Sequence, residues 1–212
     1  MKDSGPRPPQ QARSRRTLER LLGATISVIE EKGLAGVTIP EVAAAAGVST
    51  GSVYRRFMDK DALLRSAFLQ ILEDSRAANQ ASLPPDRFQG LDLDQAVRAI
   101  SRSLVVQYRG RAGLLKALDQ FLEIQSDQSF RERAVDLIEA NLRRVIEALQ
   151  PFRDEIAAEN PERAVAFALL SAATVIEVNK LQGPLLWQRM LPLDDDALAA
   201  EIAKAMAAYL RG

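Results

Sequence analysis

The segment 38–57 places two short helical patterns on either side of a single glycine, and this spacing limits the folds open to the chain. Thr38 begins the first pattern in a capping box, where its hydroxyl accepts from the amide of Glu41 and the Glu41 carboxylate reaches back. Gly47 ends that pattern, and Ser49 is a favourable N-cap for the second. Both helices must therefore be short, and the chain must turn sharply between them.

Helical spacing of apolar residues continues on both sides of this segment. Residues 13–32 carry one such pattern, which ends in a basic residue and a glycine. Asp59 is placed to cap a further helix that extends to about residue 81. Residues 1–12 contain several prolines and no periodicity, which predicts a disordered arm rich in basic residues and proline.

The helical pattern resumes beyond the break at Leu83-Pro84-Pro85, and no stretch alternates as a strand would. Two of the boundaries have a chemical cause, since Asp127 is a good cap and Pro161 suits a first helical position. The expected helices are 92–109, 111–124, 127–149, 161–181 and 194–211. The chain is therefore predicted to be all-α, with three helices in an N-terminal domain over 13–58 and a larger helical domain over 59–212.

Cysteine and histidine are both absent, and their absence narrows the classes of activity. Without cysteine the chain has no disulfide, thiol nucleophile or thiolate metal site. Without histidine the usual general base is missing, so we expect no enzyme, no metal and no cofactor. The proline-rich start has no apolar segment of the signal-peptide kind, so we expect a cytoplasmic protein.

The pattern over residues 38–56 has the order of features that a helix-turn-helix needs. Small residues such as Ala43 allow the helices to cross, Gly47 forms the turn, and the apolar Val48 follows it. Polar residues then begin the second helix. Residues 1–60 contain 10 Lys and Arg against 6 Asp and Glu, whereas the rest contains 18 against 22, which agrees with a polyanionic partner at the N-terminal end. An ordinary helical hairpin with an alanine-rich packing face remains the alternative.

The stretch 38–64 resembles the DNA-binding domain of the TetR (tetracycline repressor) family. The matching residues are Thr38, Val42, Ala43, Ala46, Gly47, Val48, Ser49, Gly51, Ser52, Val53, Tyr54, Phe57, Lys60, Leu63 and Leu64. Thr50 and Arg56 depart from the family, which more often has Lys and His at these places. The resemblance implies a helix-turn-helix that binds double-stranded DNA, joined to a helical regulatory domain that binds a ligand and dimerises.

The second helix of the motif carries side chains suited to base edges in the major groove, because hydroxyls bond either base edge and Arg pairs with guanine. The candidate base-reading residues are Ser49, Thr50, Ser52 and Arg55. The candidate phosphate-binding residues are Thr38, Tyr54, Arg56 and Lys60. For each residue, a plain exposed surface position is the alternative. Arg7, Arg13, Arg15 and Arg16 either reach a neighbouring minor groove or form a basic tail without fixed contacts.

Two C-terminal helices are predicted to form the interface of a homodimer. Helix 161–181 is apolar nearly all round, so it must be buried on more than one side. Helix 194–211 is rich in alanine, which permits close approach of helices. The resemblance implies that both join their copies in a four-helix bundle, with a large monomeric core as the alternative.

A few polar residues interrupt apolar stripes in the second domain and are candidates for an effector pocket. They are Gln107, Asn141 and Glu177, with Tyr108, Phe121, Phe130 and Trp187 as weaker aromatic candidates. The alternative for each of the three polar residues is that it bonds a neighbouring backbone group or lies at the dimer interface. The expected effector is small, uncharged or cationic, and largely apolar.

The predicted function is a repressor that binds a palindromic operator as a dimer and is released by its effector. The alternative is a DNA-architectural or protein-docking helical module without an effector. Footprinting on the DNA upstream of the protein's own gene separates the two, because only the operator-binding repressor protects a short palindrome there.

Overall fold

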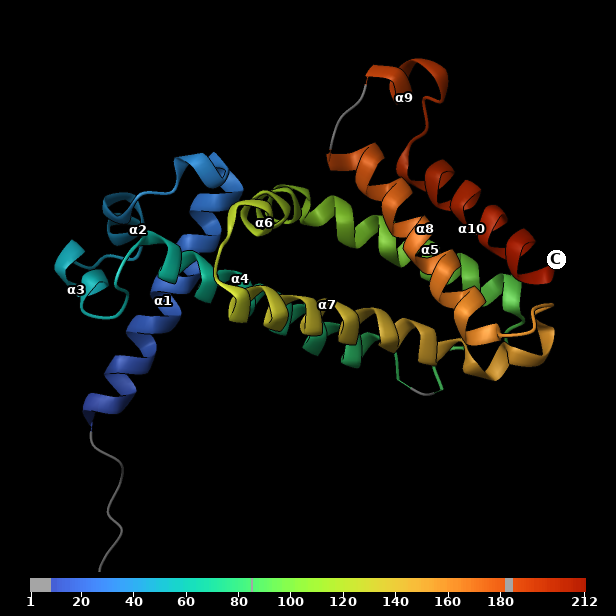
Figure 1. The fold of residues 1–212 in the computed structure, drawn as a ribbon, viewed down its shortest axis with the longest axis horizontal. Coiled ribbons are helices and arrows are strands. Elements are labelled where there is room, and N and C mark those ends of the chain that lie inside the picture. The colour runs from blue at the N-terminus through green and yellow to red at the C-terminus, as the bar shows by residue number, and fades with distance from the viewer. Residues whose placement is uncertain (1–8, 85, 182–184) are drawn as a thin grey trace, which may run out of the picture. The chain divides into compact units, whose positions relative to one another are not determined.

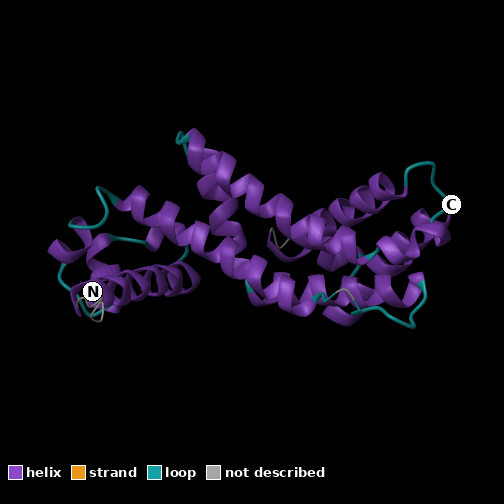
Figure 2. Ribbon diagram, turned by 90° about the horizontal axis from the view of Figure 1, so that it is seen from below, coloured by secondary structure: helices purple, strands orange, loops and turns teal. Residues whose placement is uncertain are grey.

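A computed structural model of the chain describes residues 9–84, 86–181 and 185–212, and the regular elements in these ranges are helical (Figures 1 and 2). The α-helices are α1 (Pro9–Lys32), α2 (Ile39–Ala45), α3 (Thr50–Tyr54), α4 (Lys60–Ser82), α5 (Leu93–Gly110), α6 (Ala112–Ile124), α7 (Gln128–Ala148), α8 (Pro161–Leu181), α9 (Leu185–Met190) and α10 (Asp195–Arg211). Two short 3-10 helices, η1 (Leu34–Gly36) and η2 (Gln150–Glu155), follow α1 and α7. The all-α prediction is confirmed.

Two elements differ from the expected helix pattern. The first helix begins at Pro9 rather than at residue 13, so residues 9–12 of the expected disordered arm are helical. Proline suits a first helical position, and the Gln-Gln-Ala that follows it has good helix propensity. Residues 1–8 of the arm lie outside the described residues. The short α9 was not predicted, because six residues are too few to show a periodicity.

The chain divides into two compact units. Unit 1 comprises residues up to 71 together with 117–125, and unit 2 comprises 72–116 and 126–212. α4 and α6 each contribute one part to each unit. The predicted domain boundary at residue 59 stays a prediction.

The core of unit 1 forms where α1, α2 and the first part of α4 bring their apolar faces together. Leu21 and Ile29 of α1 are fully buried, as is Val53 of α3. Phe68 of α4 stacks on Phe121 of α6, with ring centroids 5.2 Å apart and both rings buried. These contacts set the framework on which the short helices α2 and α3 rest.

Unit 2 is built from α5, α7, α8 and α10, with α5 packed on α8 and α10, and α7 packed on α8. Its core contains Leu93, Val97, Leu169, Ile176 and Leu210, all at most a few per cent exposed. A full capping box formed by Asp92 and Gln95 begins α5.

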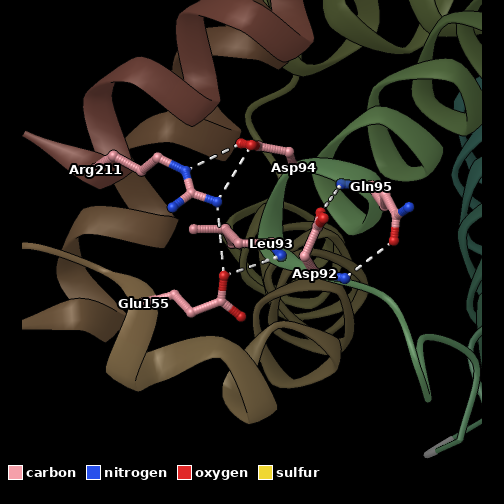
Figure 3. A network of polar contacts seen from close by, with 6 residues as sticks. All are labelled: Asp92, Leu93, Asp94, Gln95, Glu155 and Arg211. Carbon is pink, nitrogen blue, oxygen red and sulfur yellow. Dashed lines mark hydrogen bonds and ion pairs between the residues drawn. The ribbon is translucent and has the colours of Figure 1, made fainter.

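Ionic contacts join the end of α10 to the beginning of α5 in unit 2 (Figure 3). The Arg211 guanidinium donates to both carboxylate oxygens of Asp94 at 3.2 Å. It also lies 3.6 Å from Glu155, whose other contact is the amide of Leu93 at 3.3 Å. The C-terminal helix is therefore anchored at its last turn.

In the described ranges, no helix combines the length and apolar character that a membrane crossing requires.

Candidate functional site

The turn between α2 and α3 is a Schellman motif centred on Gly47. Gly47 has φ +61°, its amide donates to the carbonyl of Ala44 at 3.0 Å, and the amide of Val48 donates to Ala43 at 3.0 Å. The left-handed conformation is unfavourable for residues with a Cβ. A Cβ at this position would also lie 2.9 Å from the guanidinium of Arg20. The glycine at the predicted turn is therefore required by its backbone conformation, whereas the end of the flexible Arg20 side chain can shift to admit a Cβ.

Arg20 of α1 holds this turn from the side, which was not predicted. Its Nη2 donates to the carbonyls of Ala46 and Gly47, the latter at 3.2 Å. These carbonyls belong to the free C-terminal end of α2, where a cation is favourable. No local sequence signal marks the contact, because Arg20 and Ala46 lie 26 residues apart.

The beginning of α2 is capped by Thr38, as predicted. The amide of Glu41 donates to the Thr38 hydroxyl at 3.3 Å. The Glu41 carboxylate accepts from that hydroxyl at 3.3 Å and from Lys32 Nζ at 2.5 Å. The hydrogen bond from Lys32 lowers the pKa of Glu41 and raises the pKa of Lys32 in return. The Glu41 carboxylate thus bonds Lys32 and the Thr38 hydroxyl in place of the Thr38 amide that a capping box would use. A charge-assisted hydrogen bond is stronger than one from a neutral amide.

The exposed side of α3 carries three of the four predicted base-reading residues in one hydrogen-bonded row. Ser49 caps the helix by accepting from the amide of Ser52 at 3.3 Å, and their hydroxyls lie 3.0 Å apart. Arg55 Nη2 donates to the Ser52 hydroxyl at 2.7 Å. Thr50, the fourth, is exposed in the first turn. The row presents hydroxyls and a guanidinium to solvent on one short helix.

Two predicted phosphate-binding residues lie at the end of α3 and the beginning of α4. Tyr54 is 58% exposed, which leaves its ring and hydroxyl accessible. Lys60 lies in the first turn of α4, behind its N-cap Asp59, whose carboxylate accepts from the amide of Ala62 at 2.7 Å. The N-terminal amides of a helix favour an anion, so Lys60 is well placed for a phosphate.

Arg56, the remaining phosphate candidate, is engaged within unit 1. Its Nη2 donates to the backbone carbonyl of Ser14 at 2.8 Å and to the Ser14 hydroxyl at 3.0 Å. Both residues are exposed. Arg56 therefore connects the end of the α2–α3 region to the N-terminal part of α1, a role that sequence reasoning did not assign to it.

Residues 21–67 match the family described as bacterial regulatory proteins, tetR family. The matched residues contain α2, the Gly47 turn and α3, together with most of α1 and the first part of α4. This segment belongs to the TetR family. The resemblance predicted from residues 38–64 is confirmed.

Curated relatives of the TetR segment share only this part of their length. The chain is 43% identical over 60 residues to the HTH-type transcriptional regulator BetI of Stenotrophomonas maltophilia, a match over 28% of this chain and 31% of that protein. It is 44% identical over 59 residues to BetI of Burkholderia thailandensis, over 28% of this chain and 30% of that protein. The chain thus matches about three tenths of these relatives.

Solved structures resemble the chain over nearly its whole length at low identity. FadR from Bacillus subtilis, solved in complex with stearoyl-CoA, has a TM-score of 0.65 and 17% identity, and the match covers 90% of this chain and 98% of FadR. The TetR-family regulator PfmR from Thermus thermophilus has a TM-score of 0.60 and 17% identity, over 91% of this chain and 98% of PfmR. These matches show a shared fold.

Unit 2 contains a cavity of about 200 Å³ between α4, α5 and α7. Gln107, Tyr108 and Asn141 line it, so the structure brings together three of the seven predicted pocket candidates. Phe121 is instead a core residue of unit 1, because its ring is buried against Phe68. Glu177 is not among the lining residues, but its negative charge acts on Tyr108.

The two remaining aromatic candidates, Phe130 and Trp187, also lie elsewhere. Phe130 is buried in α7. Trp187 lines an apolar groove formed by α8, α9 and α10. Within the described parts of the chain, no group of three or more acidic, Cys or His residues is arranged to hold a metal.

The apolar groove lies along the two helices predicted to dimerise. Phe167 of α8 is 58% exposed and Tyr209 of α10 is 49% exposed, and their rings pack with centroids 5.2 Å apart. Exposed Ser171 and Ala205 also line the groove. α8 is buried in unit 2 at Ala168 and Leu169, while Phe167 is exposed, so the predicted burial of a second side of this helix stays a prediction.

Proposed function

We propose that this chain is a DNA-binding transcriptional regulator that represses genes by binding a palindromic operator. The observation that carries the proposal is the exposed row on α3, held behind the Gly47 turn within the TetR segment. Ser49, Thr50, Ser52 and Arg55 would read base edges, because hydroxyls and a guanidinium match the donor and acceptor pattern of the major groove. A DNA duplex is the partner of this surface.

Phosphates are the proposed partners of the residues around this row. Thr38, Tyr54 and Lys60 are exposed or partly exposed at the beginning or end of helices. Such contacts orient the protein on the duplex and carry no direct sequence information. Arg56 would reach a phosphate only with the part of its guanidinium that Ser14 does not use.

A homodimer through α8 and α10 is the proposed assembly. Support comes from the exposed Phe167 and Tyr209 and from the apolar groove beside them, since a large exposed apolar patch usually marks an interface. Two copies would present two recognition helices to half-sites about 34–36 Å apart, one helical turn of DNA, or a multiple of it.

A small effector in the unit 2 cavity would release the operator. FadR, which shares the fold, was solved with stearoyl-CoA, and the cavity of this chain supports a ligand within the same helical framework. α4 contributes residues to both units, so a change in its tilt is the proposed link. Operator and effector must then weaken each other's binding by the same factor.

Footprinting on DNA upstream of the protein's own gene tests the proposal. An operator-binding regulator protects a short palindrome, and competition with random DNA leaves that protection in place. Uniform protection without sequence preference would support the architectural alternative instead. Absence of any protection at low salt would reject both, because non-specific DNA binding is strongest there.

A further inference from the structure

The cavity in unit 2 carries its polar side chains in two rows. Ser75, Asn79 and Ser82 follow one another on one face of α4, at the i, i+4 and i+7 spacing of a helix. Ser103 and Gln107 lie one turn apart on α5, and Gln107 Nε2 donates to the Ser103 hydroxyl at 3.2 Å. Ser75 and Asn79 are half-buried, so this lining suits a ligand with hydrogen-bonding groups better than a purely apolar one.

An amide pair spans from α4 to α7 at this cavity. Asn79 Nδ2 donates to Asn141 Oδ1 at 3.4 Å. A carboxamide has two donor hydrogens and an acceptor oxygen. The bond between the pair therefore leaves the Asn79 oxygen and the Asn141 NH₂ group for a ligand. Both donors and acceptors are available in the same place.

Tyr108 adds a neutral donor to the lining. Burial and then the negative charge of Glu177 raise the pKa of its phenol. The hydroxyl stays protonated at physiological pH, so it donates to an acceptor on the ligand. A carboxylate oxygen is one such acceptor.

The charges at the lining are positive. Among the lining residues that the structure describes, Arg87 is the only charged one. Two more guanidiniums reach lining residues, because Arg111 donates to the Ser75 hydroxyl and Arg144 to the carbonyl of Leu83. Arg144 is paired with Glu147 at 3.4 Å, and Glu177 acts on Tyr108 from outside the lining. This distribution disfavours the cationic effector that the sequence suggested.

The shape of the cavity limits the size of the occupant. Its lining on α4 runs from Leu72 to Leu83, about 16 Å at the helical rise of 1.5 Å per residue. The volume of about 200 Å³ is below the roughly 300–1,000 Å³ of sites for drug-sized ligands. A slender molecule fits this combination, whereas a bulky coenzyme thioester does not.

We propose that the cavity binds a compact, slender carboxylic acid with a neutral hydrogen-bonding group on an apolar body. The carboxylate pairs with Arg87, the neutral group bonds the Asn79–Asn141 pair, and the apolar body packs on Ile100 and Leu104. The proposal deepens the proposed effector function and rests on it. The position of the cavity does not by itself define the chemical class of its ligand, and the lining residues supply that class.

Three probes of nearly the same size test the charge requirement on the full-length protein. They are 4-hydroxycinnamate, its uncharged methyl ester, and the cation tyramine. Isothermal titration calorimetry without DNA should give the tightest binding for the acid and weaker binding for the ester. Tyramine should bind at least tenfold more weakly than the acid. Equal or tighter binding of tyramine, or binding of none of the three at millimolar concentration, would overturn the proposal.

One variant and its control test whether Arg87 binds the carboxylate of the ligand. Arg87→Gln should weaken binding of the acid about fivefold, the effect of an exposed ion pair, and leave binding of the ester unchanged. The control Arg98→Gln removes an exposed arginine on α5 outside the lining and should change neither. Equal losses of acid and ester with Arg87→Gln would show that Arg87 does not bind the carboxylate.

Removal of an amide should affect the acid and the ester together. Gln107→Leu, at an exposed position where misfolding is not expected, and Asn141→Leu should each weaken both about fivefold, as expected for one lost hydrogen bond. Unchanged affinities in both variants would contradict the role of the polar rows. Footprinting with the same preparations separates the two proposals. Probe binding without a change in DNA affinity rejects the effector function but keeps the ligand class. Protection of a palindrome by a protein that binds none of the probes rejects only the ligand class.

Discussion

At the scale of single residues, Gly47 and Arg20 together decide the geometry of the α2–α3 turn. The glycine adopts the left-handed backbone conformation. Arg20 donates hydrogen bonds to the two carbonyls that the end of α2 leaves without a helical partner. The first contribution is visible in the sequence as a glycine between two helices. The second depends on α1 packing against α2.

Gly47→Ala should lower the free energy of unfolding by about 1–2 kcal/mol, the cost of a left-handed conformation for a residue with a Cβ. Gly51→Ala is a matched control inside α3, where the added Cβ meets only Ser49 Oγ at an ordinary 3.9 Å. Thermal unfolding should show a lower midpoint for the first variant and an equal or higher one for the second. Equal midpoints would refute the requirement for glycine at the turn.

Arg55 and Lys60 should separate base reading from phosphate binding. Arg55→Ala should weaken operator binding by about 1–3 kcal/mol and relax base preference if the guanidinium pairs with guanine. Lys60→Ala should weaken binding to operator and random DNA alike, as should Tyr54→Phe. Fluorescence anisotropy on both DNAs measures the difference. A loss of the same size on both DNAs for Arg55→Ala would remove this residue from the base-reading set.

At the scale of elements, the N-terminal part of α1 depends on a contact far away in the chain. Arg56 bonds Ser14, 42 residues apart, and the exposed Arg13, Arg15 and Arg16 surround that serine. Helix ends fray unless a tertiary contact holds them. We therefore expect Arg56 to hold this basic segment in place. Residues 9–12, which composition predicted to be disordered, are helical.

Arg56→Ala should increase amide hydrogen exchange in residues 12–18 without changing exchange in α10. Ser14→Ala keeps the bond to the Ser14 carbonyl, so it should have a smaller effect. If Arg56 also binds a phosphate, its removal lowers the slope of log affinity against log salt by about 0.9. Unchanged exchange in α1 with a lower salt slope would instead make Arg56 a phosphate ligand alone.

At the scale of the whole molecule, burial within one copy determines which substitutions report on dimerisation. Ala168 and Ala203 are each 4% exposed in the unit 2 core, so Ala168→Arg or Ala203→Arg would test folding rather than assembly. Ser171 and Ala205 are exposed in the apolar groove and report on the interface directly. The proposed dimer is expected to bury more than about 2,000 Å², the range of obligate interfaces.

Ser171→Arg should give a folded monomer at micromolar concentration, because a charge buried at an interface without a partner is costly. Circular dichroism checks the fold, and light scattering measures the mass. Arg153→Ala, at an exposed position in η2, serves as the control and should remain dimeric. A monomeric unmodified protein would reject the dimer. A dimeric Ser171→Arg variant would place the interface elsewhere.

Local chemistry determined much of this molecule, because caps, turns and helical periodicity act between residues close in the chain. Thr38, Ser49, Asp59, Asp92 and Asp194 all cap helices in the structure, and Gly47 adopts the turn that its spacing predicts. The all-α class and the TetR segment followed from the same signals.

Tertiary structure alone decided which polar residues meet. Arg20 at the turn, Arg56 on Ser14, and the Asn79–Asn141 pair each join residues at least 26 positions apart, so no local pattern contains them. It also moved Phe121 from the candidate pocket into the core of unit 1, since an aromatic residue in an apolar stripe suits either place. Burial depends on how helices pack against one another, and periodicity specifies only which face of each helix is apolar.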